Sequence, residues 1–475
     1  MFDITGLMIF TVLFPFVGAL LIPILKHFKL DSGKVALFTA AGTFVSAFLL
    51  CYYVSFGLFP VYRIPMPLGM DFHLLGDAMS AFMAAAASFL SFIIMYYSQG
   101  YIKESAYKAE FYFAAMLFLG AMMGLVFSAN LAWIFVFWEI TALCSWRLVG
   151  YFRADSDIAK ANKTFLITVF GALFLFLALV AIANSNGTID LTELRGATIP
   201  FYATLFIILA AFSKSAIFPF SSWLPDAGVA PSPVTALLHA AVLVKIGVFA
   251  FAKIFTFIIL DITAAELVMY VAAISSLIAG AAALKETNIK RVIAYSTISQ
   301  LGFIFFAIAI GGGLGTTAAF LFILMHGVAK GGLFLCAGII EHKTHTKDIT
   351  KMGGLAKVMP ITALAFGFCA LSVMGIPPFG GFFSKFMVFL AAAGEAPTMA
   401  IVLFAFAALL TLAYLTRLFH IVFIASPKQN FTKSKHEAPH QMMISVSVLA
   451  ILSLLLGLFV QWPLGYLSTM FGGAL

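Results

Sequence analysis

The sequence predicts an all-α integral membrane protein with about fourteen transmembrane helices, on three observations. Of the 475 residues, 63% are hydrophobic and only 10% are charged, whereas soluble chains are roughly 45–50% apolar and about 25% charged. The long apolar runs lack the strict alternation of membrane strands, which favours helices over a barrel. The runs are also long enough for the ~20 residues that a helix needs to cross the hydrocarbon core.

Apolar runs follow one another along almost the whole chain, separated by short polar connections. The first run has no basic segment before it and no cleavage site after it, so we expect a retained helix rather than a signal peptide. We expect helices near residues 7–25, 35–59, 77–98, 110–128, 130–150, 164–184, 201–218, 233–257, 262–284, 290–311, 314–340, 358–393, 398–424 and 441–465.

The basic residues are distributed very unequally between the two sets of connections. The even-numbered connections hold only Arg63, Arg195 and Lys253. The odd-numbered connections hold Lys26, Lys29, Lys34, Lys103, Lys108, Arg153, Lys160, Lys163, Lys285, Lys290, Arg291, Lys343, Lys347, Lys351, Lys357, Lys428, Lys433 and Lys435. We therefore expect the basic side to be cytoplasmic and both termini to be external in a multi-pass protein of the cell (inner) membrane. The net charge of +8 reflects this topology and does not indicate nucleic-acid binding.

The four cysteines give no sign of a redox or metal centre. Cys51, Cys144, Cys336 and Cys369 all lie in apolar stretches, and no C-x-x-C pair occurs. Iron–sulfur and zinc sites need clustered cysteines. We expect no cofactor and no metal in this chain.

Several ionisable residues interrupt the predicted helices, where a charge costs a few kcal/mol or more. They are Glu139, Lys214, His239, Lys245, His326, Lys330 and Lys385. One reading is structural, with Glu139 neutralising one lysine and the histidines bonding between helices. However, one acid cannot pair with four lysines, and burial disfavours the charged form of a lysine. We therefore favour a relay of proton-exchanging groups. Arg147 and Arg417 lie near helix ends and can reach the interface by snorkelling.

An internal repeat supports the functional reading. Phe212-Ser213-Lys214 in the seventh helix recurs as Phe383-Ser384-Lys385 in the twelfth, and prolines lie close to both copies. The odd offset of five helices makes the two copies run in opposite directions, as in inverted repeats with broken helices at the ion site. We divide the chain into N-terminal helices (1–109), a first repeat (110–257), a second repeat (262–424) and a C-terminal helix (425–475).

The motifs together resemble one family: the antiporter-like membrane subunits of complex I, of group 4 membrane-bound hydrogenases and of Mrp sodium/proton antiporters. The segments that carry the resemblance are Phe137-Trp-Glu-Ile, Phe212-Ser-Lys-Ser, Trp223-Leu-Pro-Asp-Ala, Lys290-Arg-Val-Ile-Ala-Tyr-Ser-Thr-Ile-Ser-Gln-Leu-Gly and Gly375-Ile-Pro-Pro-Phe-Gly-Gly-Phe-Phe-Ser-Lys.

The resemblance implies a role for each ionisable residue. It makes Glu139 and Lys214 an ion pair, and Lys245 and Lys330 central relay lysines assisted by His239 and His326. It makes Lys385 the terminal residue of the proton path. Arg147 departs from the small or apolar residue expected after the helix-five motif. Since the sequence ends after the fourteenth span, we expect no long lateral helix like that of the distal complex I subunit, and a resemblance to the shorter inner subunits or to their Mrp D-type and hydrogenase counterparts.

The resemblance leaves two functions open and disfavours a third. The leading function is a proton-translocating subunit of a complex I-type oxidoreductase, with the redox chemistry in other subunits. The alternative is a subunit of an Mrp-type sodium/proton antiporter. A stand-alone carrier of an organic solute would need a recognition site that no segment offers. The expected partners are other membrane subunits, the lipid bilayer and protons, with sodium left open.

Overall fold

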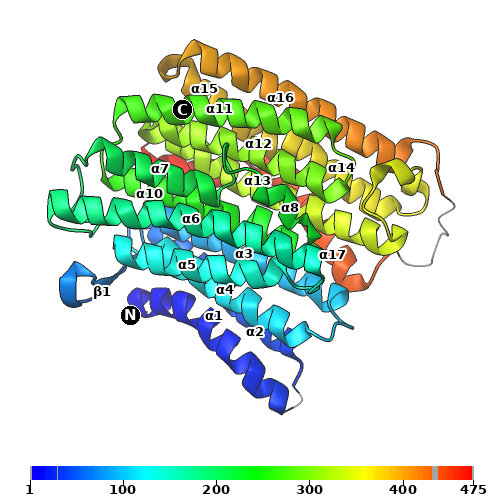
Figure 1. The fold of residues 1–475 in the computed structure, drawn as a ribbon, viewed down its shortest axis with the longest axis horizontal. Coiled ribbons are helices and arrows are strands. Elements are labelled where there is room, and N and C mark those ends of the chain that lie inside the picture. Colours follow the sequence, from blue (N-terminus) through cyan, green and yellow to red (C-terminus); the bar gives the residue numbers. More distant parts are fainter. Residues whose placement is uncertain (1–2, 29, 430–436, 473–475) are drawn as a thin grey trace. The chain divides into compact units, whose positions relative to one another are not determined.

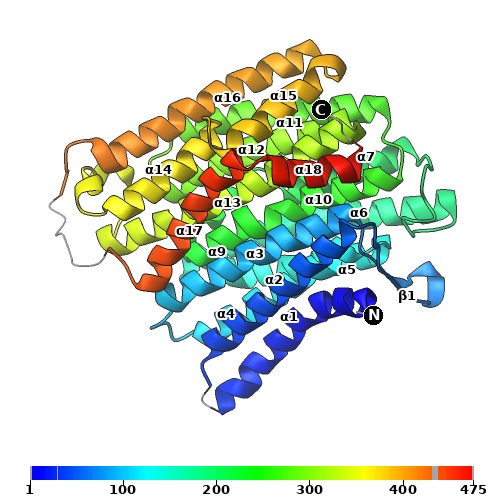
Figure 2. The same ribbon diagram turned by 180° about the vertical axis from the view of Figure 1, so that it is seen from behind.

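The computed structural model describes residues 3–28, 30–429 and 437–472. Helices dominate it, as Figure 1 and the reverse view in Figure 2 show. Lys433 and Lys435, which count toward the predicted basic side, lie outside the described residues.

All fourteen expected spans have counterparts among the described helices. Twelve are long and apolar enough to cross a membrane, and two shorter apolar helices, Phe201–Lys214 and Pro360–Met374, supply the other two. The long helices are α1 (Ile4–His27), α2 (Ser32–Val54), α3 (Ala78–Tyr101), α4 (Lys108–Phe127), α5 (Leu131–Val149), α6 (Asp155–Asn186), α9–η3–α10 (Ser232–Phe257), α11 (Ile262–Lys285), α12 (Ile289–Ile310), α13 (Gly312–Thr344), α16–η6 (Thr398–Ile424) and α17 (His440–Leu458).

One compact unit comprises Met1–Met95, Glu104–Ala216 and Ala241–Leu267. Within it α1 packs on α2 and α4, and the chain of contacts continues through α5, α6, α7 (Phe201–Lys214) and α10 (Leu243–Phe257). Local signals set the helix ends: Asn130 caps α5 by accepting from the Ala132 N–H at 3.0 Å, and Gly187 ends α6 in the left-handed conformation.

The second unit comprises Tyr96–Lys103, Ile217–Ala240 and Val268–Leu475. In it α13 contacts α12, α14 (Pro360–Met374), α15 (Gly380–Glu395) and α17, which Figure 2 shows running beside it. Short helical segments α8 (Trp223–Asp226), η2 (Ala227–Val229) and α9 (Ser232–Ala236) precede a π-helical turn, η3 (Leu237–Ala241). The 3-10 turns η4 (Ile349–Lys351) and η5 (Leu355–Lys357) link α13 to α14, and η6 (His420–Ile424) is the π-helical end that follows α16 (Thr398–Phe419).

The structure adds elements that apolar run length could not reveal. A two-stranded hairpin, β1 (Val61–Ile64) and β2 (Phe72–Leu75), pairs antiparallel around the 3-10 turn η1 (Pro67–Gly69). A further helix, α18 (Gln461–Phe471), follows α17. The strands and the last helix, which has 11 residues, are too short to be membrane spans.

Three predictions need correction. The last span is not one helix over 441–465, because α17 ends at Leu458 and α18 begins at Gln461. The twelfth helix is not continuous over 358–393, because α14 ends at Met374 and α15 begins at Gly380. Prolines at 377 and 378 cannot continue the hydrogen-bonding pattern of α14. Lys253 does not lie in a connection on the sparsely charged side: it lies inside α10 and is 1% exposed.

Candidate functional site

In the first unit, Lys214 ends α7 and is completely buried. Its ammonium donates to the Trp138 carbonyl oxygen at 3.0 Å and lies 5.1 Å from the centre of the Trp138 ring. The next residue, Glu139, is half-buried, and its Oε1 has no hydrogen-bond partner among the described residues. No ion pair within 4.0 Å joins Glu139 to Lys214 in the part of the chain that the structure describes. The two side chains are therefore near each other without a direct contact between their charged groups.

Lys245 lies on α10, beside the end of α7. Ser215, the residue after Lys214, donates to the Val244 carbonyl oxygen at 2.9 Å. At Gly247 a Cβ atom would lie 2.4 Å from the Ala211 carbonyl oxygen, so only glycine lets α10 approach α7 this closely. Glu139, Lys214 and Lys245 thus belong to three helices of one unit.

Lys253, two turns beyond Lys245 on α10, is held differently. It donates to Ser80 Oγ at 2.9 Å and to the Val126 carbonyl oxygen at 2.6 Å, close to the end of α4. A cation at a helix C-terminus satisfies unpaired carbonyl groups and the helix dipole. This geometry gives Lys253 a capping role that joins α10, α3 and α4.

In the second unit, a hydrogen-bonded chain begins at Lys330 on α13. The Lys330 ammonium donates to Ser296 Oγ and to the Ile293 carbonyl oxygen, the latter at 3.3 Å. Ser296 also accepts from the Tyr414 hydroxyl at 2.9 Å. The chain therefore leads from α13 across α12 to α16.

The chain continues from Tyr414 toward a small cavity. Tyr414 Oη lies 3.4 Å from Thr411 Oγ1, which also accepts from Gln300 at 3.2 Å. Gln300 lines a cavity of about 10 Å³ together with His326 and Lys385, which is about the space that one water molecule needs. The predicted residues His326, Lys330 and Lys385 thus lie in one unit, where a hydrogen-bonded chain leads from Lys330 to Gln300 and Gln300 lines a cavity with the other two.

Lys385 reaches back across the helix break that precedes it. Its ammonium donates to the carbonyl oxygens of Val373 at 2.8 Å and Met374 at 3.2 Å, where α14 ends. Gly375 follows in the left-handed conformation, φ 83°, and a Cβ there would lie 2.9 Å from Lys385 Cδ. The break therefore supplies the carbonyl groups that hold the buried ammonium.

His239 lies on the π-helical turn η3 and is completely buried. Its ring centre lies 4.3 Å from that of Phe334, one turn beyond Lys330 on α13. Neither ring nitrogen has a hydrogen-bond partner among the described residues. A π-turn at such a position is typical of functional sites, and it separates His239 from the α-helical segment that carries Lys245.

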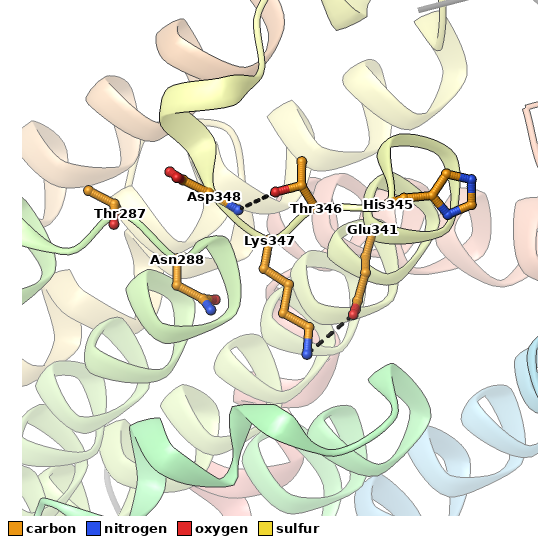
Figure 3. Close-up of a pocket in the computed structure, with 7 residues that line it drawn as sticks. All are labelled: Thr287, Asn288, Glu341, His345, Thr346, Lys347 and Asp348. Carbon is orange, nitrogen blue, oxygen red and sulfur yellow. Dashed lines mark hydrogen bonds and ion pairs between the residues drawn. The ribbon is translucent and has the colours of Figure 1, made fainter. Parts of the chain in front are cut away.

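A polar pocket of about 510 Å³ opens at the loop that follows α13 (Figure 3). Glu341 pairs with Lys347 at 3.3 Å, and its Oε2 lies 2.7 Å from Nζ of Lys290. Lys290, 1% exposed, also donates to the Ala230 carbonyl oxygen at 3.1 Å. The pocket is lined by Thr287, Asn288, Glu341, His345, Thr346, Lys347 and Asp348. Solvent thus reaches a carboxylate that contacts a buried lysine.

Two of the sequence motifs meet beside this pocket. Arg291 contacts Asp226 at 2.7 Å and Glu286 at 2.8 Å. Burial alone would raise the pKa of Glu286, but the N–H of Asn288 and the Arg291 guanidinium hold that pKa below its usual value. The Trp223-Leu-Pro-Asp and Lys290-Arg segments therefore form one ion-paired cluster.

Sequence reasoning missed the neutral members of the chain. Ser296 and Gln300 lie in a quoted motif, but nothing in the sequence pattern marked them as bridges. Tyr414 and Thr411 are three residues apart on α16, which places them on one helix face. That spacing is the only sequence signal that could have suggested them, and it is a weak one.

The comparisons with known proteins agree with the motifs. The family model described as "NADH:quinone oxidoreductase/Mrp antiporter, TM" matches residues 128–411. Curated relatives named "Na(+)/H(+) antiporter subunit A1" from Staphylococcus haemolyticus and Staphylococcus aureus are 32% identical, over 488 and 484 residues. These alignments cover 94% of this chain and 60% of each relative, so the chain spans about 60% of their length.

Two solved structures share the fold over nearly the whole chain. A chain of the Mrp complex from Dietzia sp. DQ12-45-1b superposes with a TM-score of 0.88 at 23% identity, covering 99% of this chain and 97% of that one. A chain of the membrane-bound sulfane sulfur reductase, an archaeal respiratory complex, gives 0.87 at 23%, covering 98% and 97%. The protein belongs to the NADH:quinone oxidoreductase/Mrp antiporter family of transmembrane subunits.

Proposed function

We propose that this chain is the proton-translocating, antiporter-like subunit of a multisubunit membrane complex. The observation that carries the proposal is how its buried lysines are held. Lys214, Lys330 and Lys385 each donate to neutral oxygen atoms of carbonyl or hydroxyl groups. An ammonium held by neutral acceptors can lose its proton without leaving a buried carboxylate unpaired, whereas a buried ion pair resists that loss.

In the first unit, Glu139 would control the charge of Lys214. An acid nearby favours the protonated lysine, and its withdrawal or protonation disfavours it. Since Ser215 bonds to the backbone of α10 beside Lys245, the next lysine for a proton released by Lys214 would be Lys245. Water would bridge the remaining gap.

In the second unit, Lys330 would exchange protons with Lys385 along the hydroxyl groups and then through water, because the Gln300 amide donates a hydrogen bond but does not pass a proton on. Ser296, Tyr414 and Thr411 carry hydroxyl groups that both donate and accept, so each can pass a proton while taking another. The cavity beside Gln300 would hold the water that reaches His326 and Lys385. Lys385 would then be the last lysine of the path, as the resemblance implies.

Proton uptake from the basic side would occur at the pocket of Figure 3. Glu341 is one of the two acids that line it, and it contacts the buried Lys290. If that side is cytoplasmic and both termini are external, a cysteine at the exposed position Lys351 will react from the cytoplasmic side only. The measurement is labelling with a membrane-impermeant maleimide in intact cells and in inverted vesicles, with Cys51→Ser as background. Labelling in intact cells would overturn the assignment.

Two kinds of complex fit the family. In a complex I-type oxidoreductase, other subunits would carry the redox chemistry and this chain would bind no cofactor. An Mrp-type sodium/proton antiporter is favoured by the names of the 32% identical relatives. Both assign the same roles to the buried residues of this chain.

Proton movement in inverted vesicles that contain the whole complex tests the proposal. The same experiment distinguishes an oxidoreductase complex from an antiporter complex. A pH-sensitive dye should report proton movement that Lys330→Ala abolishes while the complex stays assembled. An oxidoreductase acidifies the lumen when its electron donor is added, whereas an antiporter dissipates an existing gradient after a sodium pulse. Normal proton movement with Lys330→Ala would contradict the proposed relay in either case.

A further inference from the structure

A cavity of about 360 Å³ in the first unit lies outside the proposed relay, where α5 ends and α6 begins. Arg147, from the last turn of α5, and Arg153, from the connection to α6, enter its lining, and the remaining walls are apolar or backbone. The lining residues are Trp146, Arg147, Gly150, Arg153, Ile158 and Ala161. Arg147 stands where the resemblance implies a small or apolar residue.

The two guanidinium groups share a single acid. Arg147 Nε donates to Glu110 Oε1, and Arg153 Nη2 donates to Glu110 Oε2 at 2.7 Å. Arg147 also donates through Nη1 to the Gly150 carbonyl oxygen at 3.2 Å. An arginine has five N–H donors, so both keep donors without an acceptor among the described residues. Two cations facing one carboxylate also leave a net positive charge at the cavity.

The backbone holds Arg153 in place at a cost. Its φ of 60° lies in the left-handed region, which arginine rarely adopts. The guanidinium lies 3.8 Å from the centre of the Tyr107 ring, which stabilises the cation on an aromatic face. A strained backbone and a stacked side chain present the charge at the cavity in a fixed orientation.

The apolar walls continue along the outer surface of the two helices. Trp146 is 40% exposed and donates through Nε1 to Asn162 at 2.8 Å, and Ile158 is 39% exposed. Leu143 and Leu166 are exposed farther along α5 and α6. Tryptophan at a helix end is typical of the membrane interface. A free phosphate ion needs no such wall, whereas the glycerol and acyl chains of a lipid do.

We propose that this cavity binds the phosphate group of an anionic phospholipid, with Arg147 and Arg153 as its ligands and Trp146 and Ile158 against its glycerol and acyl chains. Guanidinium groups pair with phosphate oxygens bidentately. Glu110 competes for the same donors and sets the affinity. This proposal does not depend on the relay.

The test is lipid binding to the full chain, purified in detergent and delipidated. Native mass spectrometry with added phosphatidylglycerol should show one lipid whose dissociation constant rises at least about fivefold in Arg147→Ala and in Arg153→Ala. Lys34→Ala removes an exposed cation from the first turn of α2, a helix end that is predicted on the same side, and it should leave the constant unchanged. Phosphatidylcholine should bind more weakly, because its ammonium group faces the arginines.

Two further binding measurements distinguish a bound lipid from a bound phosphate ion or a neighbouring protein. Glu110→Gln should tighten phosphatidylglycerol binding, because it releases both arginines from the competing carboxylate; it also keeps the side chain's size. Inorganic phosphate at millimolar concentration should not displace the lipid. Equal lipid affinity in the wild type and both arginine variants would overturn the proposal. So would arginine variants that weaken only subunit assembly, which would show that a neighbouring protein's acid fills the cavity.

Discussion

Lys214 bonds to the backbone of the residue that precedes Glu139 rather than to the Glu139 carboxylate. Its ammonium donates to the Trp138 carbonyl oxygen at 3.0 Å, and Glu139 Oε1 is left without a hydrogen-bond partner in the described structure. The acid is thus close enough to stabilise the charged lysine but does not fix it. A small movement of either side chain would make or break the pair, which suits a group that must change protonation state.

The first prediction concerns this pair. Glu139→Gln removes the charge that favours protonated Lys214, and Lys214→Ala removes the exchanging group. We expect either change to lower proton translocation in vesicles by at least about 100-fold, the range of a lost proton-transfer group, with assembly unchanged by native gel. Glu266→Gln is the control, because Glu266 is an exposed acid on α11. A Glu139→Gln variant that translocates at the wild-type rate would contradict the role.

The second prediction concerns Tyr414. Tyr414→Phe keeps the ring and removes the hydroxyl that lies 2.9 Å from Ser296 and 3.4 Å from Thr411. Since no other described side chain joins these two groups, we expect translocation to fall by about tenfold or more while the melting temperature changes little. Tyr97→Phe is the matched control: Tyr97 is also buried, but its hydroxyl donates to the Leu335 carbonyl oxygen. Equal losses in both variants would indicate a packing effect only.

The sequence was sufficient for the spans and for the charged members of the site, because both depend on hydropathy. A lysine inside an apolar run is conspicuous, and Lys214, Lys245, Lys330 and Lys385 were all found to be buried. Hydropathy cannot say which atoms a buried lysine contacts. Lys214 donates to the Trp138 carbonyl oxygen and makes no direct hydrogen bond to Glu139, and Lys253, which the pattern places in a connection, is buried at the end of α4.

The hairpin and the neutral side chains that link the buried lysines were not predicted, for a different reason. Ser296, Gln300, Thr411 and Tyr414 are ordinary residues in membrane helices, and only the packing of α12 against α16 brings them together. Contacts of this kind join residues more than a hundred positions apart, and local patterns carry no information about them. Lys253 and Lys385 both bond to carbonyl groups at helix ends. The sequence alone does not predict these contacts, because they depend on where the neighbouring helices end.

The third prediction concerns the hairpin side of the first unit, where His73 Nδ1 lies 2.6 Å from Asp190 Oδ2. Burial would raise the pKa of Asp190, but bonds from His73 and Thr192 lower it below the usual value. A depressed folded-state pKa adds stability above the unfolded value of about 4, and this stability is lost as the pH falls through the folded pKa. We expect Asp190→Asn to lower the melting temperature at pH 7, and the difference from wild type to shrink below about pH 4.

Thermal unfolding in detergent at several pH values measures this difference. Asp155→Asn serves as the control, because Asp155 is exposed at the start of α6. It should melt like the wild type at every pH. A constant difference between Asp190→Asn and wild type from pH 7 to pH 3 would mean that the carboxylate charge contributes nothing.

The last prediction concerns Lys385 and separates a relay from a cap. The lysine donates to the carbonyl oxygens of Val373 and Met374, so a purely structural role as a cap of α14 is a real alternative. It also lines the cavity with His326, where a water could take its proton. Arginine retains the charge and the donors but does not release its proton near neutral pH. A cap should therefore tolerate Lys385→Arg, whereas a relay should not.

We expect Lys385→Arg to lose proton translocation as severely as Lys385→Ala, while its melting temperature stays closer to that of the wild type. Lys253→Arg supplies the comparison, because Lys253 is equally buried and also bonded to a helix-end carbonyl oxygen, that of Val126. If Lys253 acts only as a cap, its arginine variant should translocate protons normally. The pair of variants thus varies the position and keeps the substitution the same. A Lys385→Arg protein that moves protons at the wild-type rate would show that Lys385 is a cap and that the path ends elsewhere.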